Sequence, residues 1–411
     1  MGTAERCYGS VDGHLVMQHM FATNLTCFVC GEEYSVTDTL VVCKKCGGIL
    51  DVKYDLAEIQ RTANRESLRS RGRSLWRYRE FLPIKDDGSI VSLGEGLTPL
   101  RHVRQYAALL QLPHLSLKLD YLNPTGAFKD RGSTVSVSKL KELNMTSVLE
   151  DSSGNAGASL AAYCAAARIE CTIYAPATTP REKLIQARMY GAKVKTVDGS
   201  RTDVATAAEN AWKTTGLHYA SHNTNPFFVE GMKTVAYEIA EDMHWRVPDH
   251  VVFPVGGGTL LAGAYRGFEE LVKLGWIERS PRLHCVQSEA CMPIVKAFRA
   301  RAQKVTACAE GNTVAGGIRI TNPARGSQVL DSLNKTGGCA VEVSDAAILR
   351  HQSLLARLDG IFAEPTSCAA LAGLERLRQM SIIEKDEQVV VELTGFGLKD
   401  TRTAALSVES S

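Results

Sequence analysis

Short apolar runs alternate with longer stretches rich in Ala and Leu over most of the chain after Val91. The runs have the length of strands and are apolar throughout, as in a sheet that is buried on both faces. The stretches between them, such as 159–167, 181–190 and 204–214, have the length of helices. This alternation is typical of βαβ units, whose right-handed crossovers cover both faces of a parallel sheet. The pattern predicts an α/β protein, with strands at 146–149, 171–174, 193–197, 250–253, 283–286 and 389–393.

The segment 24–56 has a different pattern. Its apolar runs, 40–42 and 49–52, are short, and two Cys-x-x-Cys pairs separated by twelve residues interrupt them. Four thiolates at this spacing suit a tetrahedral Zn²⁺ ion, and a module this small needs a metal to supply much of its folding energy. Two disulfides, or a motif that has lost its metal, are the alternatives. We expect a structural zinc ribbon with no open coordination position, whose ligands are Cys27, Cys30, Cys43 and Cys46.

The two patterns divide the chain into four parts. Residues 1–23 show no clear period, and we expect an N-terminal arm there; the zinc ribbon follows at 24–56. The α/β region that remains is long enough for two domains. We predict a large α/β domain from 57–115 and 225–411, with a small α/β domain, 116–224, inserted into it and a ligand cleft between the two.

Composition and charge narrow the kinds of partner. Apolar residues make up 45% of the 411 positions, which is ordinary for a globular protein, and the formal net charge is +2. So small a charge gives no strong field, so we expect no binding to nucleic acid or to an anionic membrane surface. No apolar run approaches the roughly 20 residues of a membrane span, and the first residues lack the pattern of a secretory signal. We expect a cytoplasmic protein whose partners are small molecules or copies of itself.

Lys129 lies in a segment that suits imine chemistry. The preceding residues, 122–128, are dense in turn formers, and a helical pattern follows, so the lysine is expected at the edge of the sheet where ligand crevices form. A lysine with a lowered pKa forms imines readily. The alternative is a surface lysine paired with Asp130. Four further loops follow strands, at 152–159, 254–259, 364–367 and 393–397, and the triple glycine in the second of them suits a phosphate.

Taken in order, these five loops resemble the tryptophan synthase β-like (fold type II) pyridoxal-phosphate family. The resemblance runs from about Leu75 to about Thr403, and within the family it is strongest to the threonine synthases, through NPTGAFKDRG at 123–132 and LTGFGLKD at 393–400. Paired Cys-x-x-Cys motifs also occur in threonine synthase-like proteins of this type. The resemblance implies a fold with two parallel-sheet domains, a pyridoxal 5′-phosphate cofactor, a small amino-acid substrate and a homodimer.

The resemblance also implies a role for each loop. Lys129 would hold the cofactor as a Schiff base and shuttle protons, Phe128 would pack beside the ring, and Asn155 would bond its phenolic oxygen. Thr394 would face the pyridine nitrogen. The cofactor phosphate would be held by Gly256, Gly257, Gly258 and Thr259, and the substrate carboxylate by the loop of Ser152, Ser153, Gly154, Asn155 and Ala156.

The chain departs from threonine synthases where these bind the phosphate of their substrate. A hydroxyl residue is replaced by Ala156, a serine by Asn223 and an arginine by Phe228. Because a phosphate dianion needs charge-assisted donors, the departures put O-phosphohomoserine in doubt as the substrate. Charge from Lys233, Lys183 or Arg181 is an alternative. His222 is a candidate contact to the substrate, or else a structural histidine with its hydrogen bonds made.

Three functions remain open at this point. The first is a threonine synthase-type lyase, which eliminates phosphate at Cγ and adds water at Cβ. The second is a β-eliminase or β-replacement enzyme, similar to serine or threonine dehydratases or to cysteate synthase, which acts on serine, threonine or an O-activated serine. The third is a non-catalytic regulatory protein that keeps the cofactor fold. The first two start alike, with Lys129 removing the proton at Cα.

Overall fold

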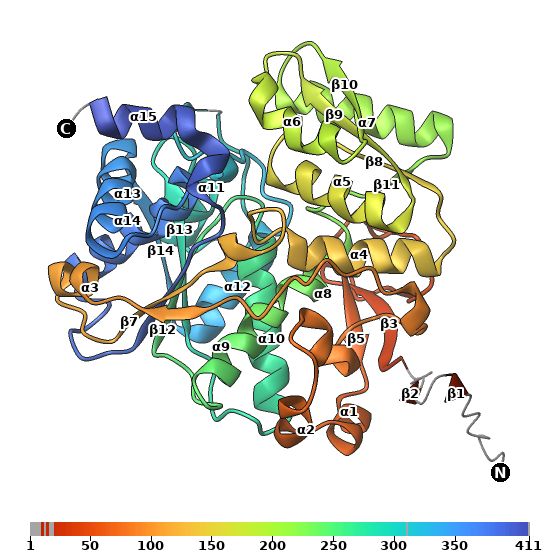
Figure 1. The fold of residues 1–411 in the computed structure, drawn as a ribbon, viewed down its shortest axis with the longest axis horizontal. Coiled ribbons are helices and arrows are strands. Elements are labelled where there is room, and N and C mark those ends of the chain that lie inside the picture. Colours follow the sequence, from red (N-terminus) through yellow and green to blue (C-terminus); the bar gives the residue numbers. More distant parts are fainter. Residues whose placement is uncertain (1–9, 12–13, 16–19, 310, 410–411) are drawn as a thin grey trace.

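The computed structural model describes residues 10–11, 14–15, 20–309 and 311–409. It has a small N-terminal module and two α/β lobes, each built on its own sheet (Figure 1). Most of the predicted arm lies outside the described residues, which include only two short strands there, β1 (Ser10–Val11) and β2 (His14–Leu15). Within the described ranges, no helix is both long enough and apolar enough to cross a membrane.

The large lobe is built on a six-stranded sheet of order β14-β13-β12-β15-β7-β6. All neighbours are parallel except β6, which pairs antiparallel with β7 at the edge. Successive residues face opposite sides: Val251 and Phe253 pack under α9–α12, and Val252 packs under α13 and α14. The strands are β6 (Leu100–His102), β7 (Leu115–Lys118), β12 (His250–Pro254), β13 (Arg282–Ser288), β14 (Cys339–Val343) and β15 (Val389–Glu392).

Helices cover both faces of this sheet, as the apolar strands require. They are α3 (Gln105–Leu110), α8 (Pro226–Met232), α9 (Thr234–Asp242), α10 (Thr259–Lys273), α11 (Pro293–Arg299), α12 (Gly326–Thr336), α13 (Asp345–Asp359), α14 (Pro365–Gln379) and α15 (Thr401–Glu409), with the 3₁₀ turns η3 (Asp120–Leu122), η4 (Gly316–Ile318) and η5 (Gly397–Asp400).

The small lobe has a four-stranded parallel sheet of order β10-β9-β8-β11. Helices α4, α5 and α6 pack on one face and α7 on the other. Its strands are β8 (Ser147–Glu150), β9 (Glu170–Pro176), β10 (Lys193–Val197) and β11 (His218–Tyr219), and its helices are α4 (Asp130–Glu142), α5 (Asn155–Ala167), α6 (Arg181–Met189) and α7 (Arg201–Thr215). All six strands predicted from the apolar runs are present, so the predicted α/β class is confirmed.

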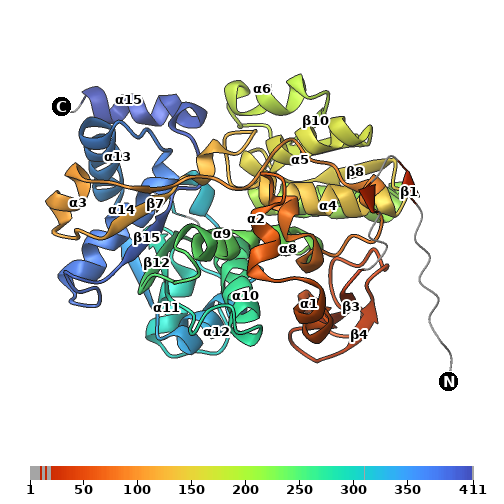
Figure 2. The same ribbon diagram turned by 60° about the horizontal axis from the view of Figure 1, so that its bottom comes forward.

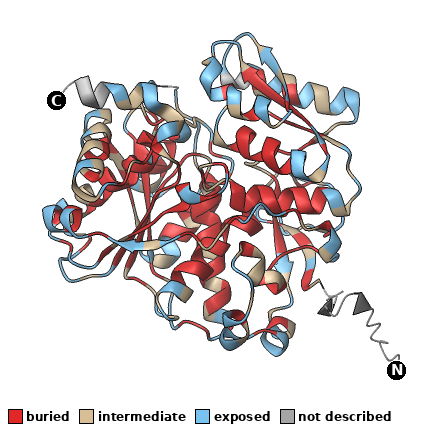
Figure 3. Cartoon of the chain, in the orientation of Figure 1, coloured by how far each residue is buried: buried red, intermediate tan, exposed pale blue. Residues whose placement is uncertain are grey.

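The N-terminal module is an antiparallel sheet of order β4-β3-β5, formed by β3 (Ala22–Cys27), β4 (Glu33–Ser35) and β5 (Leu50–Tyr54). Its apolar core continues into Val135 of α4 and Phe227 of α8. These two helices lie between the lobes and are buried over most of their length (Figures 2 and 3). The module is therefore docked on the centre of the molecule. Short helices lead from it to the large lobe: α1 (Leu56–Thr62), α2 (Arg65–Arg69), η1 (Leu75–Phe81) and η2 (Asp87–Ser89).

Two limits of the predicted division need correction. The limit at 116 falls inside β7, which pairs with β15 in the large sheet. Its last residue, Lys118, is buried and bridges Glu238 of α9 at 2.9 Å, so the strand belongs to the large lobe. The module begins at Ala22, where β3 starts, rather than at residue 24, because Ala22 already pairs with Tyr54. The other limits stay predictions.

Candidate active site

A cleft of about 1710 Å³ lies between the lobes, at the carboxyl ends of β8, β12 and β15. Loops at the carboxyl ends of parallel strands form the ligand crevice in folds of this kind. Every residue that the sequence assigned to the cofactor or the substrate lines this cleft, while the assigned roles stay predictions: Phe128, Lys129, Ser152, Ser153, Gly154, Asn155, Ala156, His222, Asn223, Gly256, Gly257, Gly258, Thr259 and Thr394.

Lys129 stands at the N-terminus of α4, at the end of the loop of turn formers. The carboxylate of Asp130 is engaged in holding that loop, because it accepts hydrogen bonds from the Thr125 amide at 2.7 Å and the Ser159 hydroxyl at 2.6 Å. The Nζ atom of Lys129 lies over two rings, 4.6 Å from the centre of Phe128 and 5.6 Å from that of Phe228. The half-buried amine is thus presented between aromatic faces on the cleft wall.

A buried ion pair fixes the helix that carries Lys129. The guanidinium of Arg131 bridges Asp120 at 2.6 Å and Glu238 of α9 at 2.5 Å, and all three side chains are fully buried. Burial alone raises the pKa of Glu238, but Arg131 and Lys118 outweigh burial and hold the pKa at about 2. The carboxylate therefore stays ionised at neutral pH. Because removing one partner of such a pair strands a buried charge, α4 is strongly held against the large lobe.

The triple-glycine loop leads into α10 and has no room for side chains. A Cβ atom on Gly257 would lie 2.3 Å from Oδ1 of Asn223, and Gly258 has a φ of +94°, which L-residues with side chains rarely adopt. Bare backbone amides ahead of a helix N-terminus form a cradle for an anion. Thr259, the first residue of α10, adds a hydroxyl beside them. These residues fit the phosphate of pyridoxal phosphate.

Two further loops close the cleft at its floor. The side-chain amide of Asn155 donates to both carboxylate oxygens of Glu364, at 3.1 and 3.2 Å. Burial raises the pKa of Glu364. The hydroxyls of Thr394 and Ser367 are 3.0 Å apart, and the carbonyl oxygen of Thr394 accepts the Phe128 amide at 2.8 Å. This backbone hydrogen bond joins the loop before Lys129 to the loop 393–397 that follows β15.

Glu150 was missed by the sequence reasoning. It ends β8 and is buried, and one of its carboxylate oxygens lies 2.9 Å from Nδ1 of His222. Burial raises the pKa of Glu150 to about 8, against the opposing effect of the Lys129 cation. Its place in the sequence could have revealed it, because a charged residue directly after the apolar run 146–149 is expected at the carboxyl end of a strand. The bond to Glu150 supports the interpretation of His222 as a structural histidine. Because His222 also lines the cleft, the geometry still allows a contact to the substrate.

The three departures from the threonine synthase pattern lie close to this group. Phe228 is 3% exposed and packs against α4, where a Cβ on Gly132 would lie 2.6 Å from its ring. The ring centre of His222 is 6.0 Å from that of Phe228. Ala156 is buried in the first turn of α5. Ala156 and Asn223 line the cleft, whereas Phe228 is outside the described lining, with its ring centre 5.6 Å from Nζ of Lys129.

Cations reach the cleft from other places. Lys233, suggested as a source of charge, is buried and bridges Glu230 at 2.7 Å and Glu270 at 3.0 Å, so that suggestion is wrong. Lys183 does line the cleft, 3.4 Å from Asp400, whereas Arg181 is absent from the described lining. Sequence reasoning did not single out Arg319 and Lys399, which line it as well.

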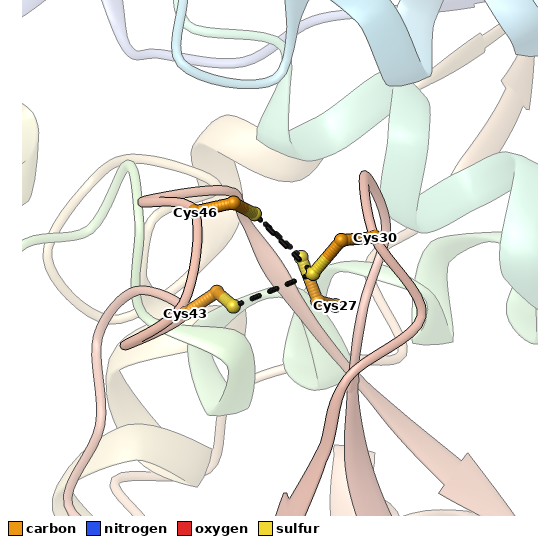
Figure 4. Close-up of side chains that lie close together, drawn as sticks. All are labelled: Cys27, Cys30, Cys43 and Cys46. Carbon is orange, nitrogen blue, oxygen red and sulfur yellow. Dashed lines mark hydrogen bonds between the residues drawn. The ribbon is translucent and has the colours of Figure 1, made fainter.

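The four cysteines of the module meet at one point (Figure 4). The Sγ atoms of Cys27 and Cys46 are 3.5 Å apart, and those of Cys30 and Cys43 are 3.7 Å apart. All four lie within 4.8 Å of one another. Sulfurs at the corners of a tetrahedron around zinc, with bonds of about 2.3 Å, are separated by about 3.8 Å. The thiols are free, so the arrangement suits a metal and differs from the predicted alternative of two disulfides.

Comparison with known proteins agrees with this geometry. Residues 91–395 match the model of the family described as pyridoxal-phosphate dependent enzyme. The threonine synthase of Methanocaldococcus jannaschii is 41% identical over 384 residues, which cover 93% of this chain and 94% of that protein. The threonine synthase of Methanosarcina acetivorans is 39% identical over 381 residues, with 92% and 93% covered.

Solved structures with the same fold include a fungal L-serine ammonia-lyase from Rhizomucor miehei. It superposes with a TM-score of 0.67 at 19% identity and covers 76% of this chain and 98% of that one. At this identity the likeness establishes the fold only. The sequence relatives give no support to the hypothesis of a non-catalytic protein. With the cofactor loops gathered around Lys129, the match to the family model and relatives at about 40% identity over nearly the whole length, the chain belongs to the pyridoxal-phosphate dependent enzymes as a threonine synthase-like lyase.

Proposed function

We propose that this protein converts O-phosphohomoserine and water to threonine and inorganic phosphate. The observation that carries the proposal is the match to two proteins named threonine synthase over more than nine tenths of the chain. In this reaction the bond between Cγ and the phosphate oxygen breaks. Phosphate leaves with that bond, after Cα and Cβ have each given up a proton. Protons then return to Cγ and Cα, and the oxygen of water joins Cβ, which gives threonine.

Pyridoxal phosphate, when bound, supplies an electron-withdrawing ring that makes the hydrogens on Cα and Cβ of an amino acid acidic. The residues that would hold it are Lys129 through its amine, Asn155 at the phenolic oxygen and Thr394 at the pyridine nitrogen. The amides of 256–258 and the Thr259 hydroxyl would hold its phosphate. The neutral hydroxyl of Thr394 leaves the pyridine nitrogen without a proton, which suits elimination at the side chain.

The chain's own groups bind the amino acid and move its protons. The loop 152–156 ends at the N-terminus of α5, a helix of 13 residues, where backbone amides and the helix dipole favour the substrate carboxylate. The Nζ atom of Lys129 takes the proton from Cα and returns protons as the side chain changes. The apolar side chains of Ala156, on the cleft lining, and of the buried Phe228, whose ring centre lies 5.6 Å from Nζ of Lys129, would help to exclude water from that amine.

The substrate phosphate needs cations, and four besides Lys129 line the cleft: Lys183, Arg319, Lys399 and Arg402 of α15. Lys183 comes from α6, Lys399 from η5, and Arg319 directly follows η4. These residues take the place of the arginine that threonine synthases have where this chain has Phe228. The substitution Arg319→Gln is expected to raise KM for O-phosphohomoserine about tenfold with a smaller change in kcat, because charge-assisted bonds to the phosphate are weakened.

A second candidate function is β-elimination from serine or threonine. The buried, apolar side chains at positions 156 and 228 favour it, since a substrate without a phosphate needs no hydroxyl or cation at these positions. One assay separates the two: the purified enzyme is given O-phosphohomoserine, serine and threonine in turn, and phosphate, threonine and 2-oxoacid are measured. Release of phosphate with formation of threonine supports the first function. A 2-oxoacid from serine or threonine, with no phosphate release, contradicts it.

We also propose that the four thiolates of the N-terminal module hold a structural Zn²⁺ ion. The tetrahedral arrangement of the Sγ atoms supports this proposal. One zinc per chain is the expected result of metal analysis on protein purified without chelators. A homodimer and a cytoplasmic location remain proposals as well. Sedimentation of the purified protein tests the first, and fractionation of cells tests the second.

A further inference from the structure

One buried arginine contacts two loops of the cleft at once. Arg325 precedes α12 and its side chain is fully buried. Its Nε donates to the carbonyl oxygen of Asn223 at 3.2 Å, and its Nη2 reaches those of Thr224 and Asn225, each at 3.4 Å. Its backbone amide donates to the carbonyl oxygen of Gly257 at 3.1 Å. Arg325 thus ties the loop 223–225 to the phosphate cradle.

The N-terminal module supplies a carboxylate for this arginine. Asp51 on β5 lies 3.5 Å from Nη1 of Arg325, and Gln328 bridges the two. The Gln328 carbonyl accepts from Nη1 at 2.7 Å, while its amide donates to both oxygens of Asp51, at 2.9 and 3.0 Å. Arg266 holds Asp51 from the other side, with one bond to its carboxylate at 3.2 Å and one to the Val52 carbonyl at 2.7 Å.

Asp51 is the main carboxylate that compensates the buried charge of Arg325. Burial lowers the pKa of Arg325 to about 10, and Asp51 is the largest opposing influence. A buried guanidinium without its carboxylate is poorly compensated, because its remaining contacts are neutral carbonyl and amide oxygens. Glu230 lies nearby but already bridges Arg266 and Lys233, each at 2.7 Å. We therefore expect Asp51 to be the carboxylate that holds Arg325 in place.

The cysteine cluster sets the position of Asp51. Strand β5 pairs with β3 so that Leu50 faces Cys27 and Asp51 faces Thr26. The two cysteine turns also touch: a Cβ on Gly48 would lie 2.9 Å from Sγ of Cys27. Any separation of the turns moves the start of β5, and Asp51 with it. A metal held by all four thiolates would lock this register.

We propose that Asp51 and Arg325 form a positioning link through which the metal-loaded module holds the loops 223–225 and 256–258 in the conformation that receives the cofactor phosphate. Asp51 is a positioning residue that acts through Arg325. The link rests on the proposed metal and is independent of which amino acid is the substrate. By thermodynamic linkage, the metal and the cofactor phosphate then strengthen each other's binding by the same factor.

The test compares wild type with Asp51→Asn and with Glu33→Gln, a control at an exposed acidic residue of the same module. The dissociation constant of pyridoxal phosphate is measured by cofactor absorbance on cofactor-free protein, and the ³¹P resonance of its bound phosphate is recorded. Asp51→Asn is expected to weaken cofactor binding about tenfold and to shift the resonance, with zinc content unchanged. Glu33→Gln is expected to match wild type, and Asp51→Glu to recover most of the affinity.

Metal removal gives the decisive comparison. A zinc chelator should weaken cofactor binding about tenfold in wild type and hardly at all in Asp51→Asn, because the link is already broken there. Equal weakening in both proteins, or wild-type affinity in Asp51→Asn, would overturn the proposal. Gln328→Met covers the case in which Asp51→Asn does not fold, since it removes only the bridging amide. It should weaken cofactor binding two- to threefold in the same direction, and an unchanged affinity there would also overturn the link.

Discussion

The four-cysteine module and the cleft are two sites of different construction in one chain. The module draws its four sulfurs from residues 27–46, and its surface ion pair Lys45–Glu32 is 63% and 40% exposed, so this pair contributes little. The cleft draws its groups from loops between residue 128 and residue 403, and its ion pair Arg131–Glu238 is fully buried. The comparison teaches that the cleft is positioned by the apolar cores of the two lobes, whereas the module, if it holds the proposed metal, is positioned by four ligands close together in the sequence.

The largest expected effect is on the cleft alone. Lys129→Ala should lower turnover at least about a thousandfold, because it removes both the cofactor anchor and the group that transfers protons. The melting temperature should change little, since Asp130 and Arg131 still anchor α4. Product assays with cofactor absorbance check the first point and thermal unfolding the second. Unchanged turnover would refute the assignment of Lys129. A large fall in melting temperature would contradict the expectation that changes in the cleft, unlike those in the module, leave stability unchanged.

The reverse experiment damages the module alone. Cys27→Ala should destabilise the protein by about 4 kcal/mol, since the buried Cys27 is one of the four proposed metal ligands and three cysteines hold a metal weakly. Cys339→Ala, at a half-buried cysteine outside the cluster, should cost about 1 kcal/mol. Denaturant unfolding measures both. Chelator should destabilise wild type and Cys339→Ala while leaving Cys27→Ala unchanged; a chelator effect on all three would contradict the metal site.

Gly257→Ala tests whether the proposed phosphate cradle has room for a side chain. The new methyl group would lie 2.3 Å from Oδ1 of Asn223, so either the loop or the asparagine must shift. Overpacking of this kind costs about 1–3 kcal/mol, which corresponds to roughly a 5- to 150-fold loss of pyridoxal phosphate affinity. Gly154→Ala, where a Cβ meets open space, is the matched control and should bind the cofactor nearly as wild type does. Equal losses in the two variants would show that cradle crowding is not the cause.

The smallest effect is a pH dependence of stability that belongs to the cleft. Burial raises the pKa of Glu150 to about 8, above its ordinary value of 4.5 in an unfolded chain. The folded state therefore binds this proton more tightly, so the stabilisation is full below pH 4.5 and is lost as the pH rises towards 8. Glu150→Gln should flatten the decline of the melting temperature over this range, on the order of 2 °C. A decline as steep as that of wild type would remove Glu150 as its cause.

Much of the cleft could be predicted because its loops follow recognisable strands. The glycines at 256–258 and the turn formers before Lys129 predict tight loops from the sequence alone. Because the strands are parallel, their loops meet at the same edge of the sheet. Glu150 was not singled out, and Glu364 was given no role within its loop, because an acidic residue has no functional signature until its burial is known. The suggestion of Lys233 as a phosphate ligand was wrong for the same reason. Its side chain is positive, but it is buried in ion pairs with Glu230 and Glu270 inside the large lobe.

The sequence by itself determined the α/β class and the grouping of four cysteines into one cluster, because each depends on spacing and periodicity within short segments. The family followed from the resemblance of five short loops to those of known pyridoxal-phosphate enzymes. Tertiary structure decided which charges meet. Whether Asp51 faces water or meets the buried Arg325 depends on packing between segments far apart in the chain. Burial removes the water that would otherwise screen such a pair, and no local pattern records it.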